Sequence, residues 1–368
     1  MKQSILILTA FPPNNKTAGQ NYTKNLIIQL SNKYHIDFIN FQYKNHKQYD
    51  FKSSRVRFLK EIPLDDTMKL LNVTKLPFVH PFFSCRFSLK TLKWIRQIAN
   101  KYQILYFDFS QIFVYATMIK HQNKVLMCHD IIGQKYSRKT NHFISKLNQH
   151  FVQLSEKLVL KQANSRIFCL NEKDSNLINT HYGLKSHTVD LILENHVKNC
   201  VIDKLNNSYC LFGSWNRPEN LESLIWVLKN LYDKIPPNYY ITVIGGGLNN
   251  ELIDNKKYDR VKFTGFLVNP YPIIASSKAL LAPLFNGAGV KVKVIESLAC
   301  GTPVIGTDVA LEGITFKHHL FMRANSIEDF SRSIQRVRDI SLDEKRALKK
   351  LFLAQYPKKQ FSDDPFIK

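Results

Sequence analysis

The sequence predicts an α/β protein of two domains, each built around a parallel β-sheet, and three observations carry this prediction. A length of 368 residues exceeds what one hydrophobic core usually holds, and 44% apolar residues suit globular folding. Short β-branched runs alternate with helical segments, the pattern of sheets covered by helices. The polar segment 194–207 separates two such series, so we expect one domain over residues 1–198 and another over 199–354.

The first series begins with an apolar run at residues 5–9. Pro12 and Pro13 end this run without a cleavage site for secretion, so we interpret it as the first strand. Asn171 is placed to cap the last helix of the series. The expected strands are 5–9, 36–40, 56–62, 104–107, 125–128, 166–170 and 188–192, and the expected helices are 20–33, 89–101, 111–120, 142–163 and 172–180.

The second series repeats the alternation of strands and helices. Ser326 with Asp329 and Ser341 with Glu344 have the spacing of capping boxes. Two Rossmann-like domains that face a cleft would place ligand sites at the carboxyl ends of their strands. The expected strands are 209–212, 240–244, 261–264, 279–282 and 304–307, and the expected helices are 220–232, 271–276, 290–299 and 326–338.

Composition narrows the environment and the partners. No run approaches the roughly 18 apolar residues of a membrane span, and six cysteines without a Cys-x-x-Cys pair indicate buried thiols in a reducing cytosol. The net charge of +23 is concentrated in residues 1–200, which hold 29 Lys and Arg against 12 Asp and Glu. Either an anionic partner or the lysine bias of an AT-rich genome explains this charge. No nucleic-acid-binding motif is recognisable, so we expect no nucleic-acid partner.

The most informative segment is 287–307, which combines a glycine-rich loop, a short helix and an apolar strand. The glycines let the backbone approach a ligand closely, and the helix N-terminus offers N–H groups and a partial positive charge to phosphate. Lys293 and Glu296 share a helix face, so one can neutralise phosphate while the other accepts hydrogen bonds from ribose hydroxyls. A buried α/β crossover with solvated lysines explains the same spacing.

This segment resembles the donor-nucleotide motif of family-4 retaining glycosyltransferases, which have the GT-B fold. Ala288 stands where relatives often have a first glutamate, and the backbone N–H groups of Gly289 and Val290 remain to hold the donor. The resemblance also implies that a C-terminal helix returns to the N-terminal domain, here within residues 355–368. The residues that match the family motif are Gly287, Gly289, Lys293, Glu296, Gly301, Pro303, Val304 and Thr307.

The resemblance assigns two residues of the N-terminal domain to the donor. Gly19 follows the first strand, where the family has a glycine pair, and His129 ends a buried strand, where the family often places a histidine near the donor sugar. A histidine capped by backbone is the alternative for His129. Asp130 either orients this histidine or caps the next turn.

Further donor contacts are implied in the C-terminal domain. Gly213 follows its first strand, but Asn220 occupies a place where many relatives have a lysine. Arg217 is then the candidate phosphate contact, or else a solvated loop residue. Gly265 and Phe266 lie at the turn that relatives use to line the base pocket.

An irregular segment at 64–92 combines phenylalanines with basic residues, and the helix expected over 89–101 has an apolar stripe among basic side chains. Such a helix either lies on an anionic membrane, near a lipid-linked acceptor, or packs on its own sheet. The phenylalanines are Phe78, Phe82, Phe83 and Phe87, and the stripe is Leu89, Leu92, Ile95 and Ile98.

We therefore expect a retaining glycosyltransferase that moves a sugar from a UDP- or GDP-linked donor to a glycan or lipid-linked glycan in bacterial surface polysaccharide synthesis. His129, Lys293 and Glu296 are the expected catalytic residues. No Asp-x-Asp pair, the usual metal–diphosphate holder of the other major glycosyltransferase fold, is present, so we expect neither metal nor cofactor. The expected location is cytoplasmic, with peripheral attachment to the inner face of the membrane. A sugar-nucleotide epimerase and a non-catalytic anchor of a glycan-assembly complex stay open as alternatives.

Overall fold

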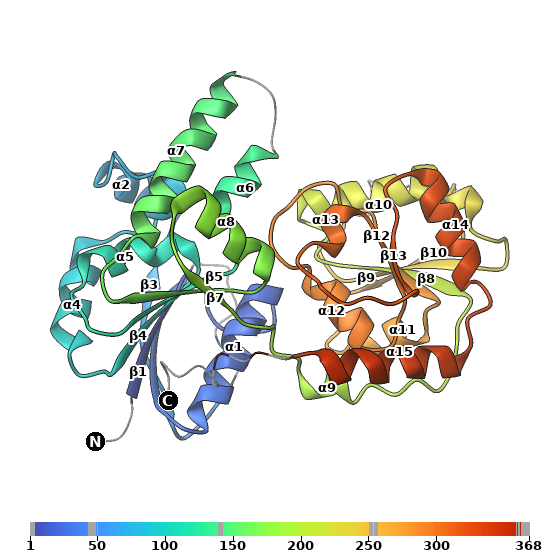
Figure 1. Cartoon of the computed structure of the whole chain (residues 1–368), viewed down its shortest axis with the longest axis horizontal. Helices are drawn as coiled ribbons and strands as arrows, with labels where there is room; N and C mark the ends of the chain where they lie inside the picture. The colour runs from blue at the N-terminus through green and yellow to red at the C-terminus, as the bar shows by residue number, and fades with distance from the viewer. Residues whose placement is uncertain are drawn as a thin grey trace. The chain divides into compact units, whose positions relative to one another are not determined.

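The computed structural model describes residues 4–42, 49, 51–138, 143–249, 253, 257–357, 359 and 361. The chain forms two compact units (Figure 1). Unit 1 comprises the chain up to Ile192 together with Lys359 and Phe361, and unit 2 comprises the described residues from Leu193 to Pro357. Each unit is an α/β structure, as the sequence predicts.

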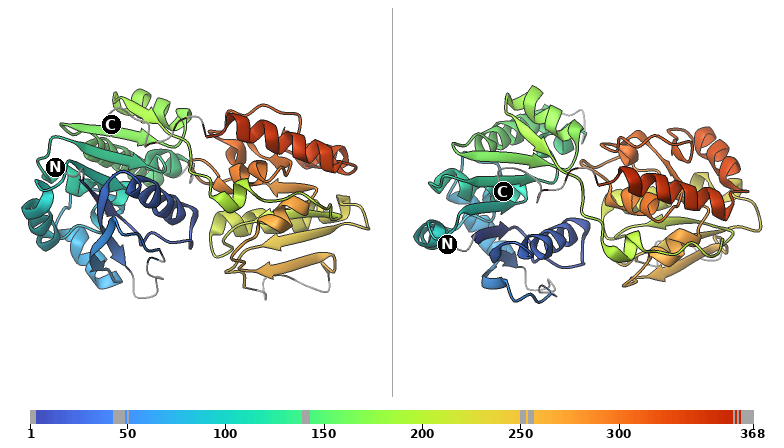
Figure 2. Two further views of the ribbon diagram at one scale, coloured as in Figure 1. Left: turned by 90° about the horizontal axis from the view of Figure 1, so that it is seen from below. Right: turned by 60° about the horizontal axis from the view of Figure 1, so that its bottom comes forward.

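The described part of unit 1 contains seven parallel strands in the order β3-β2-β1-β4-β5-β6-β7. Helices cover both faces of this sheet (Figure 2), which explains why its central strands are continuous apolar runs. The strands are β1 (Ser4–Thr9), β2 (His35–Gln42), β3 (Val56–Pro63), β4 (Ile104–Asp108), β5 (Lys124–Cys128), β6 (Ser165–Cys169) and β7 (Ser186–Thr188). The helices are α1 (Ala18–Ser31), α2 (Asp66–Thr74), α3 (Pro81–Ser84), α4 (Leu89–Ala99), α5 (Phe113–Met118), α6 (Ile132–Ser137), α7 (Phe143–Leu160) and α8 (Glu172–Tyr182).

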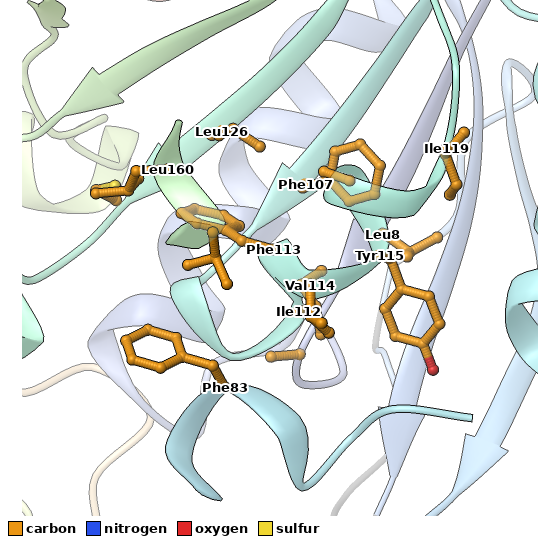
Figure 3. Packing of buried hydrophobic residues seen from close by; sticks show 14 of the residues in the cluster. Leu8, Phe83, Phe107, Ile112, Phe113, Val114, Tyr115, Ile119, Leu126 and Leu160 are labelled. Carbon is orange, nitrogen blue, oxygen red and sulfur yellow. The ribbon is translucent and has the colours of Figure 1, made fainter. Parts of the chain in front are cut away.

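The core of unit 1 follows from the alternation of side chains along its strands. Leu8 of β1 and Phe107 of β4 enter a large apolar cluster with residues of α3, α5 and α7, among them Phe83 and Phe113 (Figure 3). Ile7, the neighbour of Leu8, is also fully buried but faces the other side of the sheet. Both faces of the sheet are therefore apolar and covered.

The apolar stripe of α4 packs on the sheet of its own unit. Leu92 and Ile95 are buried in the cluster, and Ile98 packs against it, whereas Leu89 is exposed. Of the two alternatives for this stripe, the structure shows packing on the sheet of its own unit, which covers Leu92 and Ile95. Of the four phenylalanines before it, Phe83 and Phe87 are buried, Phe82 packs on the cluster, and only Phe78 is exposed.

Unit 2 contains, within its described residues, six parallel strands in the order β10-β9-β8-β11-β12-β13. Trp226 of α10 packs against Phe330 of α14, which places both helices on one face; α15 packs on α12 at the other face. The strands are β8 (Ser208–Phe212), β9 (Tyr240–Ile244), β10 (Val261–Gly265), β11 (Ala279–Ala282), β12 (Val304–Gly306) and β13 (Phe321–Arg323). The helices are α9 (Asn195–Lys198), α10 (Pro218–Asn230), α11 (Tyr271–Ser276), α12 (Val292–Ala299), α13 (Asp308–Leu311), α14 (Ile327–Val337) and α15 (Leu342–Gln355).

The units divide after Ile192 and after residue 358, a few residues from the expected positions at 198 and 354. The first division lies earlier because α9, expected as linker, packs against α12. Helix α15 stays in unit 2, while Phe361 packs on Tyr106 of unit 1 at a ring distance of 5.1 Å. Residues 358, 360 and 362–368 of the expected returning segment lie outside the described residues.

Candidate functional site

In unit 2, the turns that follow β8, β9 and β10 meet at the carboxyl edge of the sheet. Gly213 N donates to Ile244 O over 3.1 Å, and Gly245 N donates to Gly265 O over 3.0 Å. Gly245 has a φ of +120°, and a Cβ atom there would lie 1.9 Å from the Gly213 carbonyl oxygen. Only glycine fits at residue 245, so backbone forms this part of the edge.

The loop between β11 and α12 supplies the second part of the same edge. Gly287 and Gly289 both have positive φ, at 117° and 70°. The Lys291 ammonium donates to the carbonyl oxygens of Ala288 and Gly289, at 3.1 and 2.6 Å, and so organises the loop before Val290. Lys291 is also the N-cap of α12 and makes no side-chain cap there, which leaves the first-turn N–H groups without a side-chain acceptor at the cap.

Lys293 is the second residue of α12, and its side chain contacts α10. Its Nζ donates to Asn220 Oδ1 over 2.8 Å. Desolvation lowers the pKa of Lys293 to about 7, the positive charges of Arg217 and Lys291 act in the same direction, and Glu219 opposes them. An anion bound beside this amine would favour its charged form again, so the position suits a phosphate.

Glu296, one turn after Lys293, is buried and bonded to α11. The Tyr271 hydroxyl donates to Glu296 Oε1 over 2.9 Å. Burial raises the pKa of Glu296 to about 8, the charge of Glu194 adds to the rise, and the Tyr271 hydrogen bond works against it. The two residues of the predicted Lys-x-x-Glu pair thus have separate partners, and burial drives both toward their neutral forms.

The remaining residues predicted for the donor in unit 2 lie around these turns. Arg217 precedes α10 and pairs with Glu219 at 3.0 Å, with its side chain 54% exposed. Phe266 is 69% exposed and follows Gly265, whose φ is +66°. A Cβ atom on Gly246 would lie 3.2 Å from that of Phe266, so Phe266 lies beside the glycine turn after β9.

In unit 1, the ends of β4 and β5 and the start of α1 bring Gly19 and His129 together. The His129 ring stacks on Phe109 at a centroid distance of 3.9 Å. A Cβ atom on Gly19 would lie 2.8 Å from the Phe109 ring and 3.8 Å from His129 Nδ1. Phe109 itself has a φ of +72°, a strained value for a bulky residue.

The carboxylate that holds His129 is Asp108, not the adjacent Asp130. His129 Nε2 lies 2.8 Å from Asp108 Oδ1, and the His129 side chain is 10% exposed. The hydroxyls of Thr9 and Thr23 donate to the other Asp108 oxygen. Because a neutral imidazole that donates from Nε2 keeps Nδ1 as an acceptor, the ring has one nitrogen left for a ligand.

Three of these residues were absent from the sequence prediction. Asp108 could have been found as a carboxylate at the end of a buried strand that neighbours the His129 strand. Tyr271 carried no signal, because its partner Glu296 lies 25 positions away. Trp215 is buried at 2% exposure beside Gly245, and its Nε1 has no hydrogen-bond partner among the described protein groups.

The predicted residues therefore form two groups, one in each unit. The group in unit 2 lies at the carboxyl edge of the sheet, on the turns after its strands and on α12, and the group in unit 1 lies at the ends of β4 and β5. The first group is Gly213, Arg217, Gly265, Phe266, Gly287, Ala288, Gly289, Val290, Lys293 and Glu296, and the second is Gly19 and His129.

Comparison with known proteins gives a family match within unit 2 and structural similarity along most of the chain. Residues 207–339 match the family model of glycosyl transferases group 1. A search of curated protein sequences found no match. Sucrose-phosphate synthase from Thermosynechococcus elongatus has a similar structure, with a TM-score of 0.66 at 14% identity over 96% of this chain and 97% of that one.

Two further solved structures are similar over the whole chain. WaaG, a glycosyltransferase involved in lipopolysaccharide biosynthesis, gives a TM-score of 0.65 at 12% identity over 96% of this chain and 95% of its own. Anabaena HepE in complex with UDP gives 0.67 at 11% identity over 96% of both chains. Residues 207–339 thus match glycosyl transferases group 1, and the chain as a whole has the GT-B fold.

Proposed function

We propose that this protein is a retaining glycosyltransferase that transfers a sugar from a nucleotide-sugar donor to a glycan or lipid-linked glycan of a bacterial surface polysaccharide. One observation carries the proposal. Lys293, with its pKa lowered to about 7, lies near the uncapped start of α12 and contacts the start of α10 through Asn220. An amine in this state, beside a helix N-terminus without a side-chain cap, is suited to a diphosphate.

The unit 2 residues would stabilise the departing nucleotide. Breaking the glycosyl–phosphate bond leaves negative charge on the diphosphate, and Lys293 with the α12 N-terminus would hold it. One preorganised donor of this kind typically lowers a barrier by roughly 2.7–4 kcal/mol. Glu296 would accept hydrogen bonds from ribose hydroxyls, and Arg217 is a further candidate for phosphate. Since Lys293 supplies the positive charge, the proposed transfer requires no metal.

The unit 1 residues would act on the sugar. Asp108 holds the His129 ring, so that Nδ1 can accept a hydrogen bond from a sugar hydroxyl. The acceptor hydroxyl would attack the face that the phosphate leaves, and its proton would pass to the departing phosphate oxygen. Charge and protons then balance without a protein nucleophile, and the anomeric configuration is retained.

UDP is the first nucleotide to test. HepE was solved with UDP, and a trehalose-6-phosphate protein from E. coli with UDP-2-fluoro glucose, at 9% identity to this chain. The neighbour WaaG takes part in lipopolysaccharide biosynthesis. The part of WaaG in lipopolysaccharide biosynthesis supports a surface-polysaccharide role for this chain, which we propose to take place in the cytoplasm at the inner face of the membrane.

Thermal unfolding with UDP, GDP, ADP and CMP in EDTA tests the proposal. A ligand at 100 times its dissociation constant adds about 2.7 kcal/mol to the free energy of unfolding. We expect one diphosphate to stabilise the wild type and to lose this effect in Lys293→Met and Glu296→Ala. Absence of stabilisation by every nucleotide at millimolar concentration would contradict a donor site and favour the non-catalytic anchor.

A further inference from the structure

Helix α7 presents a row of large apolar side chains that nothing in the described chain covers. Leu147, Leu154 and Leu158 are 57%, 55% and 55% exposed. Their spacing of seven and four residues places them along one side of the helix at about 100° per residue. Val152 and Val159, on the opposite side, are fully buried. We call the three leucines the leucine face.

A second apolar segment borders the leucine face. The His80 backbone N–H donates to Ser155 Oγ over 2.9 Å, and His80 Nε2 lies 3.1 Å from Asn148 Oδ1. These partners occupy one flank of the leucine face, because each follows a leucine by one position. Phe78, two residues before His80, is 88% exposed. Helix α2, just before this segment, adds exposed side chains of its own, which are Met68, Leu70 and Leu71.

The other flank of the leucine face is basic. Lys146 and Lys157 each precede a leucine by one position, and Lys161 follows Leu158 by three, so all three lie on the flank away from His80. Their side chains are exposed. The described part of α7 contains one carboxylate, Glu156, which is buried and accepts hydrogen bonds from the backbone of α6. The exposed surface of α7 therefore combines apolar side chains with lysines and has no exposed carboxylate in its described part, and on α2 the exposed Asp66 is paired with Lys69.

This combination selects among the possible occupants of the surface. A second copy of the chain in a symmetric pair would double the number of lysines at the interface without adding an exposed carboxylate from α7, and their repulsion disfavours such an interface. An anionic bilayer accepts both components, because leucine and phenylalanine enter the interface while lysines contact lipid phosphates. No helix in the described residues is long and apolar enough to cross a membrane, so contact would be at the surface.

We propose that the leucine face, with Phe78 and the exposed side chains of α2, docks on an anionic phospholipid bilayer, and that Lys146, Lys157 and Lys161 contact its phosphates. The inference rests on the proposed function in one respect, which is that a lipid-linked acceptor would bring the enzyme to a membrane. Vesicle binding requires neither donor nor transfer, so the docking surface and the enzymatic activity can fail separately.

Co-sedimentation of the full chain with vesicles tests the docking surface. The test compares vesicles of phosphatidylcholine alone with vesicles that also contain about 30% anionic phosphatidylglycerol. Binding is measured at low and at physiological salt. We expect at least tenfold tighter binding to the anionic vesicles. A variant with Leu147, Leu154 and Leu158 changed to Gln should lose at least tenfold. A variant with Lys146, Lys157 and Lys161 changed to Gln should lose the preference for anionic lipid.

Matched controls lie in unit 2. Leu351→Gln changes an exposed leucine outside the leucine face, 40% exposed, and Lys317→Gln with Lys350→Gln removes exposed charge elsewhere. Neither control should alter vesicle binding, and circular dichroism melting shows whether each variant is folded. Equal binding to both vesicle types, or unchanged binding by both the leucine and the lysine variants, would overturn the proposal. The proposal would also be overturned if the wild type bound no vesicles but formed a dimer in sedimentation velocity, and the leucine variant were monomeric.

Discussion

Two ionisable side chains on α12 are held near their neutral forms before any ligand binds. Burial lowers the pKa of Lys293 to about 7 and raises that of Glu296 to about 8. Such shifts are frequent at functional sites, where burial and neighbouring charges adjust the pKa of a group to its task. The same burial lowers the free energy of unfolding. If these residues serve a ligand, replacing them with neutral side chains should stabilise the free protein, whereas a structural role predicts a loss of stability.

Lys293→Met should stabilise the free protein and abolish its stabilisation by a nucleoside diphosphate. Below pH 7, Lys293 is charged in both the folded and unfolded states, so the folded protein carries the full cost of desolvating the ammonium. Removing the charge at pH 6 should raise Tm, by roughly 2–4 °C for each kcal/mol regained. Differential scanning calorimetry with and without UDP measures both effects.

Lys229→Met is the control for this prediction, because Lys229 is an exposed residue of α10. It should change neither the Tm of the free protein nor the shift with nucleotide. A Lys293→Met protein that melts lower than the wild type, or that keeps the nucleotide shift, would show that Lys293 supports the fold rather than the ligand.

Glu296→Gln should remove a pH dependence of stability. The folded pKa of about 8 lies above the ordinary value of 4.5, so between these values the folded protein binds more protons than the unfolded chain. The contribution of Glu296 is therefore fully present below about pH 4.5 and is lost as pH rises toward 8, at up to about 1.4 kcal/mol per pH unit. Urea unfolding from pH 5 to 8 should show a shallower decline for the variant. Parallel curves for the two proteins would refute the assignment.

At the scale of elements, the start of α1 and the ends of β4 and β5 pack together around His129. Gly19→Ala would place a Cβ atom 2.8 Å from the Phe109 ring, which stacks on His129. We expect the ring pair to shift and turnover to fall by roughly tenfold to a hundredfold, since displacements near 1 Å have this effect on catalysis.

Binding of the diphosphate in unit 2 should persist in Gly19→Ala, because Gly19 belongs to unit 1. Steady-state kinetics together with UDP calorimetry therefore distinguishes the two groups. The conservative Thr23→Ser keeps the hydroxyl that bonds Asp108 and should retain activity. If Gly19→Ala weakened UDP binding as much as turnover, the division of roles between the units would be incorrect.

Strong local patterns predicted most elements, and tertiary contacts decided the others. The capping boxes at Ser326 and Ser341 are confirmed, since both side chains bond as the spacing predicts. The last strand of unit 1 was expected at 188–192 but β7 is Ser186–Thr188, because pairing with β6 rather than the β-branched run sets its position. Helix α9 lies in the segment predicted as linker, because three of its four residues are polar and its packing on α12, with Val197 buried, is not visible in the sequence.

The candidate site was predictable where its residues are close in sequence. The loop and helix over 287–296 could be recognised as one motif, because backbone geometry alone brings their groups together. The contacts of Lys293 with Asn220 and of Glu296 with Tyr271 join residues 73 and 25 positions apart. Only the order of the strands determines which turns meet at the edge of the sheet, and one sequence does not encode that order locally.

At the scale of the whole molecule, two surfaces of different character belong to the two units. Unit 2 carries the group around α12, and unit 1 carries His129 and the leucine face beside basic residues. The charge excess of residues 1–200 was visible in the sequence, but the exposed leucines of α7 were not, because the same spacing fits a buried stripe. Burial of the α4 stripe and exposure of the α7 leucines show that packing decides between the two.

The most direct test of the central claim follows a panel of UDP- and GDP-sugars in EDTA with the wild type and Lys293→Met. We expect the wild type to release nucleoside diphosphate from one of these donors, faster with glycan acceptor extracts, and Lys293→Met to release at least a hundredfold less, as loss of one such donor implies. NMR of the product should show the donor's anomeric configuration. Conversion of the nucleotide sugar without release of diphosphate, or equal rates for the two proteins, would contradict glycosyl transfer at this site.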